Sequence, residues 1–206
     1  MTKSKHKSFN ESGVAADPVM QFLAWFAEAA KAVKEEVNAM CLSTAGKGGR
    51  PSGRMVLLKE VDYRGFVFYT SYASRKGEEI GENPRVAATF FWKELERQVR
   101  ITGKAKKITA RESRAYFDTR PLESRVSAAI SPQSKPIPNR RWLEKKRDAL
   151  LKTLNGRDDV PMPSDWGGYR IVPDEIEFWQ GREFRLHDRI LYQKKGKSWK
   201  ISRLAP

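Results

Sequence analysis

The chain is poor in cysteine, in histidine and in long apolar runs. Cys41 is the only cysteine among 206 residues, which excludes an intrachain disulfide and favours a reducing compartment. The richest apolar stretch, residues 19–33, is interrupted by Glu28 and Lys31, and residues 1–13 lack the apolar segment of a secretion signal. We therefore expect a cytoplasmic protein with no membrane-spanning segment.

Acidic side chains are scarce relative to basic ones. The sequence has 25 Asp and Glu against 40 Lys and Arg, a formal net charge of +15. This surplus predicts an anionic partner: a nucleic acid, a membrane surface or a phosphorylated small molecule, among which charge alone does not choose. With 39% hydrophobic and 11% aromatic residues the chain can close a core, which excludes disorder throughout.

Residues 1–16 are expected to form a flexible basic tail, and residues 17–206 a single domain. Asp17 followed by Pro18 predicts the start of a helix, because aspartate is a favoured N-cap and proline a favoured first residue. The apolar residues that recur at helical spacing, and that we expect to face the core, are Leu23, Phe26, Ala30 and Val33.

The centre of the chain consists of short β-prone runs separated by turn residues, which predicts consecutive antiparallel strands. Residues 46–53 predict a wide turn and residues 62–65 a tight hairpin. The expected strands of this part are residues 40–44, 55–61, 66–70, 86–92 and 98–102. Two further strands are expected, one before and one after an arginine-rich segment at residues 182–189, and residues 198–203 form the last strand.

Two further helices are expected downstream. Thr109 and Glu112 form a capping box that begins a helix ending near residue 117, and Asn139 caps another. The predicted fold class is therefore α+β and mainly β, a barrel of short strands with helices at its side.

Two charged segments lie among the predicted strands. Arg54 and Lys59 end a strand-like run and are five positions apart, so strand alternation would place them on opposite faces, where they would serve different anions or stay solvated. Residues 74–77 predict a turn after a strand end. Its N–H groups and cations would bind a phosphate, or the segment is an ordinary turn with no ligand.

Three more polar segments are candidates for ligand contacts. Gln98, if directed inward, offers both a donor and an acceptor to a heterocycle. Tyr116 and Arg120 are four apart on one helix face, and Ser124 as the next N-cap would complete a phosphate pocket; a surface stacking pair is the alternative. A proline-bounded loop holds Gln133 and its neighbour Ser134.

The densest segment, residues 178–189, combines three aromatic residues, three arginines, two carboxylates and His187, the only histidine beyond the tail. Arginine forks match the oxygens of phosphates and carboxylates in two-point geometry. We therefore expect this segment to bind an anionic, planar ligand.

Several blocks, taken together and in order, resemble one family, the pyridoxine/pyridoxamine 5′-phosphate oxidases. The resemblance runs from about residue 17 to residue 206. The blocks are RMVLLK at 54–59, SRKG at 74–77, ERQV at 96–99, WGGY at 166–169, FWQG at 178–181, RLHDR at 185–189 and RLAP at 203–206.

The resemblance implies an FMN-binding split β-barrel of antiparallel strands with flanking helices, assembled as a homodimer with FMN at the subunit interface and using no metal. Arg185 and His187 would be the catalytic residues. The implied FMN contacts are Arg54, Met55, Val56, Leu57, Leu58, Lys59, Tyr69, Thr70, Arg75, Lys76, Gln98, Gln133, Ser134, Trp179 and Arg189. The implied substrate contacts are Lys59, Tyr116, Arg120, Ser124, Arg185, Leu186 and His187.

The implied reaction oxidises pyridoxamine or pyridoxine 5′-phosphate to pyridoxal 5′-phosphate, with O2 as acceptor and release of H2O2, and of ammonia from the amine. It belongs to vitamin B6 biosynthesis and salvage. Two features depart from the family: residues 1–16 contain neither arginine nor tyrosine, which the substrate-covering arm of relatives often has, and Lys135 replaces a small hydroxyl residue.

Two alternatives remain open. A phenazine-biosynthesis-type FMN oxidase shares the barrel but acts on a non-phosphorylated tricycle, so it needs no substrate-phosphate pocket. A basic nucleic-acid-binding module would be colourless and would bind with steep salt dependence, but it leaves the ordered blocks unexplained. We expect neither a nucleic-acid partner nor a membrane partner.

Overall fold

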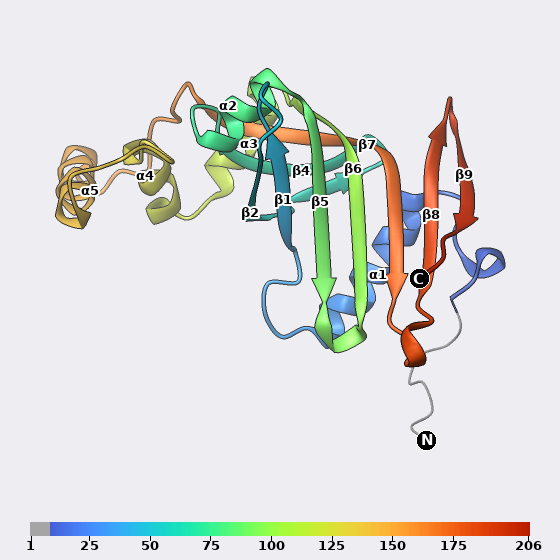
Figure 1. Cartoon of the computed structure of the whole chain (residues 1–206). Coiled ribbons are helices and arrows are strands. Elements are labelled where there is room, and N and C mark those ends of the chain that lie inside the picture. Colours follow the sequence, from blue (N-terminus) through green and yellow to red (C-terminus); the bar gives the residue numbers. More distant parts are fainter. Residues whose placement is uncertain (1–8) are drawn as a thin grey trace.

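The computed structural model describes residues 9–206, which form a curled, nine-stranded antiparallel sheet with helices around it (Figure 1). The strand order is β2-β1-β5-β6-β7-β4-β3, with β8 paired to β7 and β9 paired to β8. This confirms the predicted fold class. The strands are β1 (Ala39–Ala45), β2 (Pro51–Leu57), β3 (Glu60–Asp62), β4 (Gly65–Ser71), β5 (Arg85–Trp92), β6 (Arg97–Lys107), β7 (Trp166–Gln180), β8 (Asp188–Lys195) and β9 (Ser198–Arg203).

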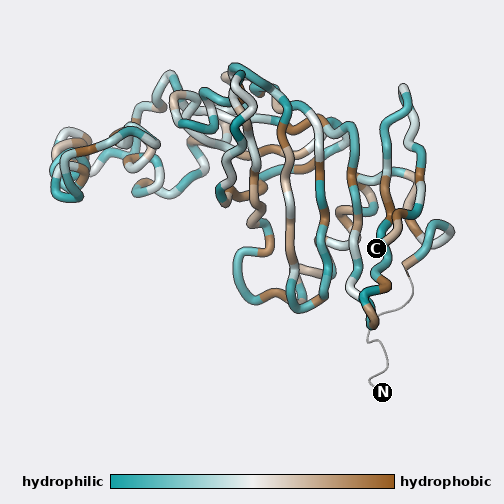
Figure 2. The backbone as a smooth tube through the Cα atoms, in the orientation of Figure 1, coloured by the Kyte–Doolittle hydropathy of each residue, from teal (hydrophilic) through white to brown (hydrophobic). Residues whose placement is uncertain are grey.

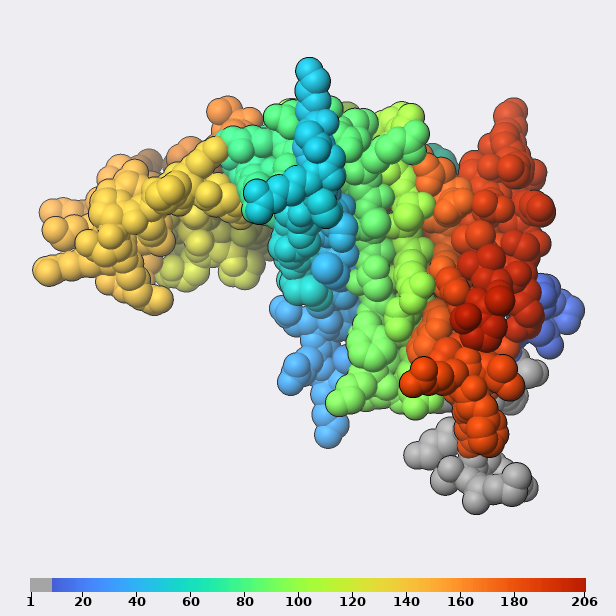
Figure 3. Space-filling model, viewed as in Figure 1, coloured from blue at the N-terminus to red at the C-terminus, as the bar shows by residue number. Residues whose placement is uncertain are grey.

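Five α-helices and three short 3-10 helices accompany the sheet in the described residues. Helix α1 lies behind β5, β6 and β7 in the view of Figure 1, and α4 and α5 project from the side opposite β8 and β9, a protrusion also visible in Figure 3. The helices are α1 (Pro18–Ala32), α2 (Arg75–Glu82), α3 (Ala110–Thr119), α4 (Leu122–Ile130), α5 (Arg140–Leu154), η1 (Glu11–Gly13), η2 (Lys93–Leu95) and η3 (Glu183–Arg185).

Strand β7 organises the sheet because it has different neighbours along its length. It pairs with β6 over residues 169–180, with β4 over residues 166–171 and with β8 over residues 175–180. The β6–β7 register shifts between Thr102 and Gly103, opposite Pro173, and a Cβ on Gly103 would lie 2.2 Å from the Val172 carbonyl oxygen. Only glycine fits this bend, which sends the two halves of β7 toward different parts of the molecule.

The main core lies between α1 and the sheet, and Figure 2 shows the apolar positions concentrated along the strands. Phe22, Phe66, Phe90 and Phe178 are fully buried there, and each such side chain contributes about 1.5–3 kcal/mol of transfer free energy. A second, smaller core of Phe117, Val126, Leu154, Val160 and Trp166 joins α3, α4 and α5 to the start of β7.

Helix α1 begins as predicted, but its buried face only partly matches the predicted one: Phe26 and Val33 pack against the core, as expected. The Asp17 carboxylate accepts two backbone N–H groups of the first turn. Leu23 and Ala30, predicted to face the core, are exposed, whereas Phe22 and Trp25 are buried. Apolar side chains occupy more than one face of this helix. Which face is buried is therefore decided by packing against the sheet, and not by the spacing of apolar residues in the sequence.

The predicted strand at residues 55–61 is two strands. β2 ends at Leu57 and β3 begins at Glu60, because Leu58 donates its N–H to the Asn38 carbonyl and Lys59 donates to the Val67 carbonyl. This break ends the alternation, so the prediction that Arg54 and Lys59 lie on opposite faces was wrong. The predicted turn at 46–53 is also shorter, since β2 begins at Pro51.

Two helices were missed by the sequence patterns. Residues 74–77 form the cap and first turn of α2, where the Ser74 hydroxyl accepts the Gly77 N–H, and not an isolated turn. Ser124 lies inside the first turn of α4, whose N-cap is Pro121, so its predicted capping role was wrong. The capping box at Thr109 and the cap at Asn139 are confirmed.

The expected N-terminal tail is packed over the part that the structure describes, residues 9–16; residues 1–8 lie outside the described residues. The Phe9 and Trp25 ring centroids are 4.8 Å apart, and the Tyr192 hydroxyl donates to the Ala15 carbonyl at 2.7 Å. Apolar contact and a partly buried hydrogen bond hold these residues against α1 and β8. Among the described helices, none has the length and apolar character required to cross a membrane.

Candidate active site

A cavity of about 510 Å³ opens between β2, β4, α3, α4 and the first residue of β7. It brings together side chains that the sequence separates by up to half the chain. The predicted site residues that line it are Arg54, Met55, Val56, Leu57, Lys59, Tyr69, Thr70, Lys76, Tyr116, Arg120, Ser124 and Gln133. The lining residues that were not predicted are Ser71, Pro121, Ser127, Ala128, Ser131 and Trp166.

Lys76 supplies the first cationic position of the cavity. Its side chain is buried, and its Nζ donates to Gln133 Oε1 at 2.9 Å and to Thr70 Oγ1 at 3.1 Å. No carboxylate of the described residues forms an ion pair with it. Burial lowers the pKa of Lys76, and the nearby charge of Arg54 lowers it further. A buried ammonium held only by neutral oxygens is a favourable position for an anion.

Arg54 is held in place by a partly buried carboxylate, that of Glu79. Its guanidinium donates to the hydroxyls of Thr44 and Ser52 and to Glu79 Oε2, the last at 3.3 Å. Burial raises the pKa of Glu79, but hydrogen bonds from Ser52, Thr44 and Arg75 outweigh this and lower it to about 2. The Nε of Arg75 donates to Glu79 at 2.8 Å, and Arg75 does not line the cavity.

Arg120 supplies the second cationic position. It follows the last residue of α3, and its guanidinium lies 4.9 Å from the Trp166 ring and 5.7 Å from the Phe117 ring. Its Nη1 is the one buried side-chain nitrogen or oxygen of the described chain without a hydrogen-bond partner. Burial lowers the pKa of Arg120, and the nearby Tyr116 offsets part of this decrease. An unpartnered, desolvated guanidinium fits a bound anion.

Three nearly parallel aromatic rings form one wall of the cavity. The ring centroid of Tyr69 lies 3.9 Å from that of Tyr116 and 5.4 Å from that of Trp166. The Tyr69 hydroxyl donates to Glu60 Oε1 at 2.7 Å, and burial together with this bond raises the pKa of Tyr69. Trp166 was not predicted as a site residue, although the sequence signal was present in the block of residues 166–169.

Gln98, Trp179 and Arg189 lie side by side on β6, β7 and β8, as direct register partners. Gln98 does not point inward as predicted, because its neighbour Val99 fills the inward position and is fully buried. The Arg189 guanidinium instead donates to both carboxylate oxygens of Glu177, at 2.7 Å and 3.1 Å. These predicted flavin contacts therefore form a row on the outer face of the sheet.

Arg185, Leu186 and His187 lie beside this row, in and after η3. Phe184 and Arg185 have φ values of 56° and 62°, a left-handed backbone that places Leu186 in solvent, 68% exposed. The His187 ring centroid is 4.6 Å from that of Trp179. The Arg182 N–H donates to His187 Nδ1 at 3.1 Å, so a neutral His187 carries its proton on Nε2.

One chain does not bring these two groups together. The cavity adjoins Trp166, the first residue of β7, whereas Trp179 lies next to its last, and at about 3.3 Å per residue roughly 40 Å of strand separates them (Figure 1). Two other predicted flavin contacts also lie outside the cavity. Leu58 is buried in the main core, and Ser134 is exposed with a φ of 68°.

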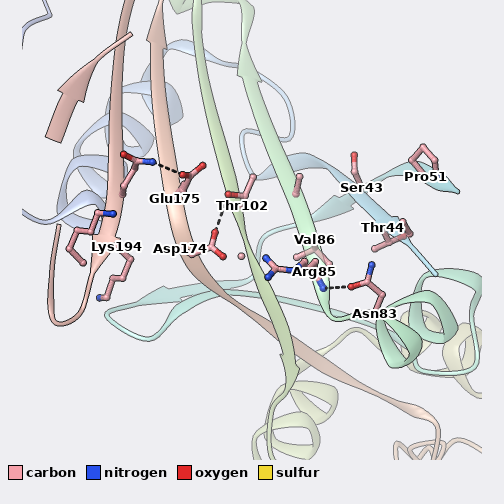
Figure 4. Close-up of a pocket in the computed structure, with 15 residues that line it drawn as sticks. Ser43, Thr44, Pro51, Asn83, Arg85, Val86, Thr102, Asp174, Glu175 and Lys194 are labelled. Atoms are coloured by element: carbon pink, nitrogen blue, oxygen red, sulfur yellow. Dashed lines mark hydrogen bonds between the residues drawn. The ribbon is translucent and has the colours of Figure 1, made fainter. Parts of the chain in front are cut away.

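A second depression, of about 610 Å³, lies on the outer face of the sheet (Figure 4). Two pairs of its polar side chains bond to each other: Thr102 donates to Asp174 at 3.1 Å and Gln193 to Glu175 at 2.8 Å. It contains no predicted site residue and no buried cation that lacks an anionic partner. The smaller cavity is therefore the candidate active site.

Comparison with known families identifies the chain. Residues 26–152 match the family model described as pyridoxamine 5′-phosphate oxidase, and residues 166–206 match the pyridoxine 5′-phosphate oxidase C-terminal dimerisation region. The chain belongs to the pyridoxamine 5′-phosphate oxidase family. It is accordingly an oxidase of this family with FMN as its cofactor, as predicted.

Curated relatives support this membership over nearly the whole chain. The pyridoxine/pyridoxamine 5′-phosphate oxidase of Rubrobacter xylanophilus is 54% identical over 95% of this chain and 90% of its own. That of Burkholderia lata is 52% identical, over 97% and 94% respectively.

Solved structures share the fold. PhzG from Burkholderia lata, in complex with tetrahydrophenazine-1-carboxylic acid, superposes with a TM-score of 0.91 at 31% identity, over 97% of this chain and 98% of its own. A pyridoxamine 5′-phosphate oxidase-related, FMN-binding protein from Nostoc punctiforme has a TM-score of 0.75 at 15% identity, over 94% and 100%. The latter likeness concerns the fold alone.

Proposed function

We propose that the protein oxidises pyridoxamine 5′-phosphate and pyridoxine 5′-phosphate to pyridoxal 5′-phosphate, with O2 as electron acceptor. The observation that carries the proposal is the pair of cations in one cavity, Lys76 and Arg120, each lacking a carboxylate partner among the described residues. One suits the phosphate of FMN, and the other suits the phosphate of the substrate.

The residues around Lys76 fit the FMN phosphate. Thr70 and Gln133 contribute polar groups beside the ammonium, and Arg54 of β2 lines the same cavity with its position fixed by Glu79. Each charge-assisted hydrogen bond to the phosphate would contribute about 1.5–3 kcal/mol and offset its desolvation. FMN, when bound, supplies the acceptor for two electrons from the substrate and their transfer to O2, which becomes H2O2.

The residues around Arg120 fit the second phosphate. Lys59, Tyr116 and Ser124 line the same cavity, and with Arg120 they offer two cations and two hydroxyls. Their role is to bind and orient the substrate, so that its reacting carbon is held beside the flavin. A phosphate dianion is a better match for two cations than a single carboxylate.

A phenazine-type substrate is the second candidate, favoured by the TM-score of 0.91 with PhzG. Sequence identity favours vitamin B6: the chain is 52% identical to the oxidase of Burkholderia lata and 31% identical to PhzG of the same species. The test compares peroxide formation by the FMN-loaded protein with pyridoxamine 5′-phosphate, pyridoxamine and tetrahydrophenazine-1-carboxylic acid. We expect pyridoxamine 5′-phosphate to be turned over far more efficiently than pyridoxamine, which should remain a measurable but poor substrate; preference for the tricycle would exclude the proposal.

The second group of residues leads us to infer a shared site. We propose that Gln98, Trp179, Arg185, His187 and Arg189 of one copy complete the cavity of the other in a homodimer. Arg185 would orient the substrate, His187 would hold a proton at Nε2 and donate it toward the substrate, and Arg189 would balance charge near the flavin. The match of residues 166–206 to a dimerisation region supports this arrangement.

Mixed dimers test the sharing directly. Arg120→Met damages the cavity, and Arg185→Ala damages the other group, so each homodimer should lose most of its activity. If the site is shared, a mixed dimer has one doubly altered site and one intact site, and a statistical mixture should recover about a quarter of wild-type activity. If each chain builds its own site, no activity returns, and that result would refute the shared arrangement.

A further inference from the structure

We propose that Trp166 is a positioning residue that fixes Arg120 for phosphate recognition, and thereby sets the preference for a phosphorylated over an unphosphorylated substrate. The inference rests on the function proposed above. It assigns to Trp166 a task beyond filling the small core.

Trp166 contacts three groups of the cavity wall from one rigid position. Its ring is parallel to those of Tyr69 and Tyr116, with interplanar angles of 13° and 5°, and the Arg120 guanidinium lies over it at 4.9 Å. The residue is only 7% exposed. Its backbone is fixed because Trp166 pairs with Ser71 of β4 and donates its N–H to the Pro163 carbonyl at 3.1 Å.

Ring faces are the main contacts that hold the Arg120 side chain. No hydrogen bond or ion pair joins its guanidinium to any described residue. Its backbone is fixed separately, since Arg125 donates from Nε to the Arg120 carbonyl at 3.0 Å. The head group is therefore oriented by the Trp166 and Phe117 rings, which contact each other with their centroids 5.0 Å apart and both lie beside it.

This mode of support suits a residue that must bind a phosphate. A carboxylate partner would orient the guanidinium, but it would also occupy the N–H donors and cancel the positive charge. A ring face attracts the cation without using its donors, which stay available in the plane of the guanidinium. The tryptophan face is the strongest of the aromatic faces for this contact.

The alternative is that Trp166 only fills space in the small core, beside Phe117 and Leu154. In that case its replacement would lower stability and reduce activity toward all substrates alike. Positioning of Arg120 instead predicts a selective loss, confined to substrates that carry the phosphate. The two roles are therefore separable by substrate.

The experiment measures steady-state peroxide formation by FMN-loaded Trp166→Leu and Trp166→Phe, with pyridoxamine 5′-phosphate and with pyridoxamine. We expect Trp166→Leu to raise the KM for the phosphorylated amine about tenfold, with kcat changed less than about twofold. The kcat/KM for pyridoxamine should stay near wild type. Trp166→Phe keeps a ring face and should recover most of the loss.

Trp142→Leu is the matched control, because Trp142 also carries a cation over its ring, Lys146 at 4.3 Å, but lies on α5 outside the cavity. It should leave both KM values unchanged. Thermal unfolding and FMN content confirm that each variant is folded and loaded. An equal fall in kcat/KM for both substrates, or an unchanged KM in Trp166→Leu, overturns the inference. A wild-type enzyme indifferent to the phosphate instead refutes the proposed function.

Discussion

Replacing Lys76 by methionine should weaken FMN binding while leaving the FMN-free protein as stable as before, or more stable. Lys76 is only 9% exposed, and its ammonium donates hydrogen bonds to neutral oxygens alone. A phosphate would supply the counter-charge that the folded chain lacks. Loss of one charge-assisted hydrogen bond of about 1.5–3 kcal/mol predicts a Kd for FMN about 10- to 100-fold higher.

The same substitution removes an uncompensated buried charge from the FMN-free protein. Methionine has a similar length and no desolvation penalty, so the free energy of unfolding should be unchanged or higher by up to about 2 kcal/mol. Flavin fluorescence quenching measures the Kd, and urea unfolding without FMN measures stability. Lys152→Met, at an exposed position of α5, is the control for loss of charge alone. A Kd within twofold of wild type would show that Lys76 does not meet the phosphate.

Three further predictions follow from the fold and its charges. Gly103→Ala should destabilise the protein by about 2–4 kcal/mol, because its Cβ would meet the Val172 carbonyl, whereas Gly48→Ala, with open space around it, should be nearly neutral in the same urea titration. The pKa of Glu79 is lowered from 4.5 to about 2, so the stability that its carboxylate contributes is complete above pH 4.5 and is lost as the pH falls toward 2. The difference in urea midpoint between wild type and Glu79→Gln should therefore shrink over that pH range. A difference that stays constant would contradict the assignment. Because the pKa of Lys76 lies below its ordinary value of 10.5, FMN affinity should begin to fall at a lower pH than an ordinary lysine would allow; Lys76→Arg should move the fall upward in a fluorescence titration, and an unmoved curve would assign the titration to another group.

Local signals in the sequence predicted local structure well. Helix starts at Asp17, Thr109 and Asn139 are confirmed, because a capping side chain bonds to backbone groups only two or three residues away. The hairpin at residues 62–65 and the bounds of β9 are confirmed for the same reason. In each case the deciding interaction lies within the segment itself or with its immediate neighbour.

Features decided by distant contacts were not predictable from spacing. The buried face of α1 depends on which stripe meets the sheet, and Lys59 reaches the same cavity as Arg54 because residues 58 and 59 bond to other segments. Trp166 enters the site through contacts with residues far earlier in the chain, such as Tyr69. The resemblance supplied most of the site residues, but only the structure divides them into two separate groups.

The length of β7 has a consequence for any attempt to redesign this protein. Trp166 and Trp179 lie near opposite ends of one continuous strand. The length of this strand therefore acts as a ruler: it sets the distance between the cavity residues and the group that contains Trp179. Deleting two residues would keep every side chain on its original face but shorten that ruler by about 6.6 Å. Such a deletion would preserve the alternation of the sheet and still misplace one group relative to the other.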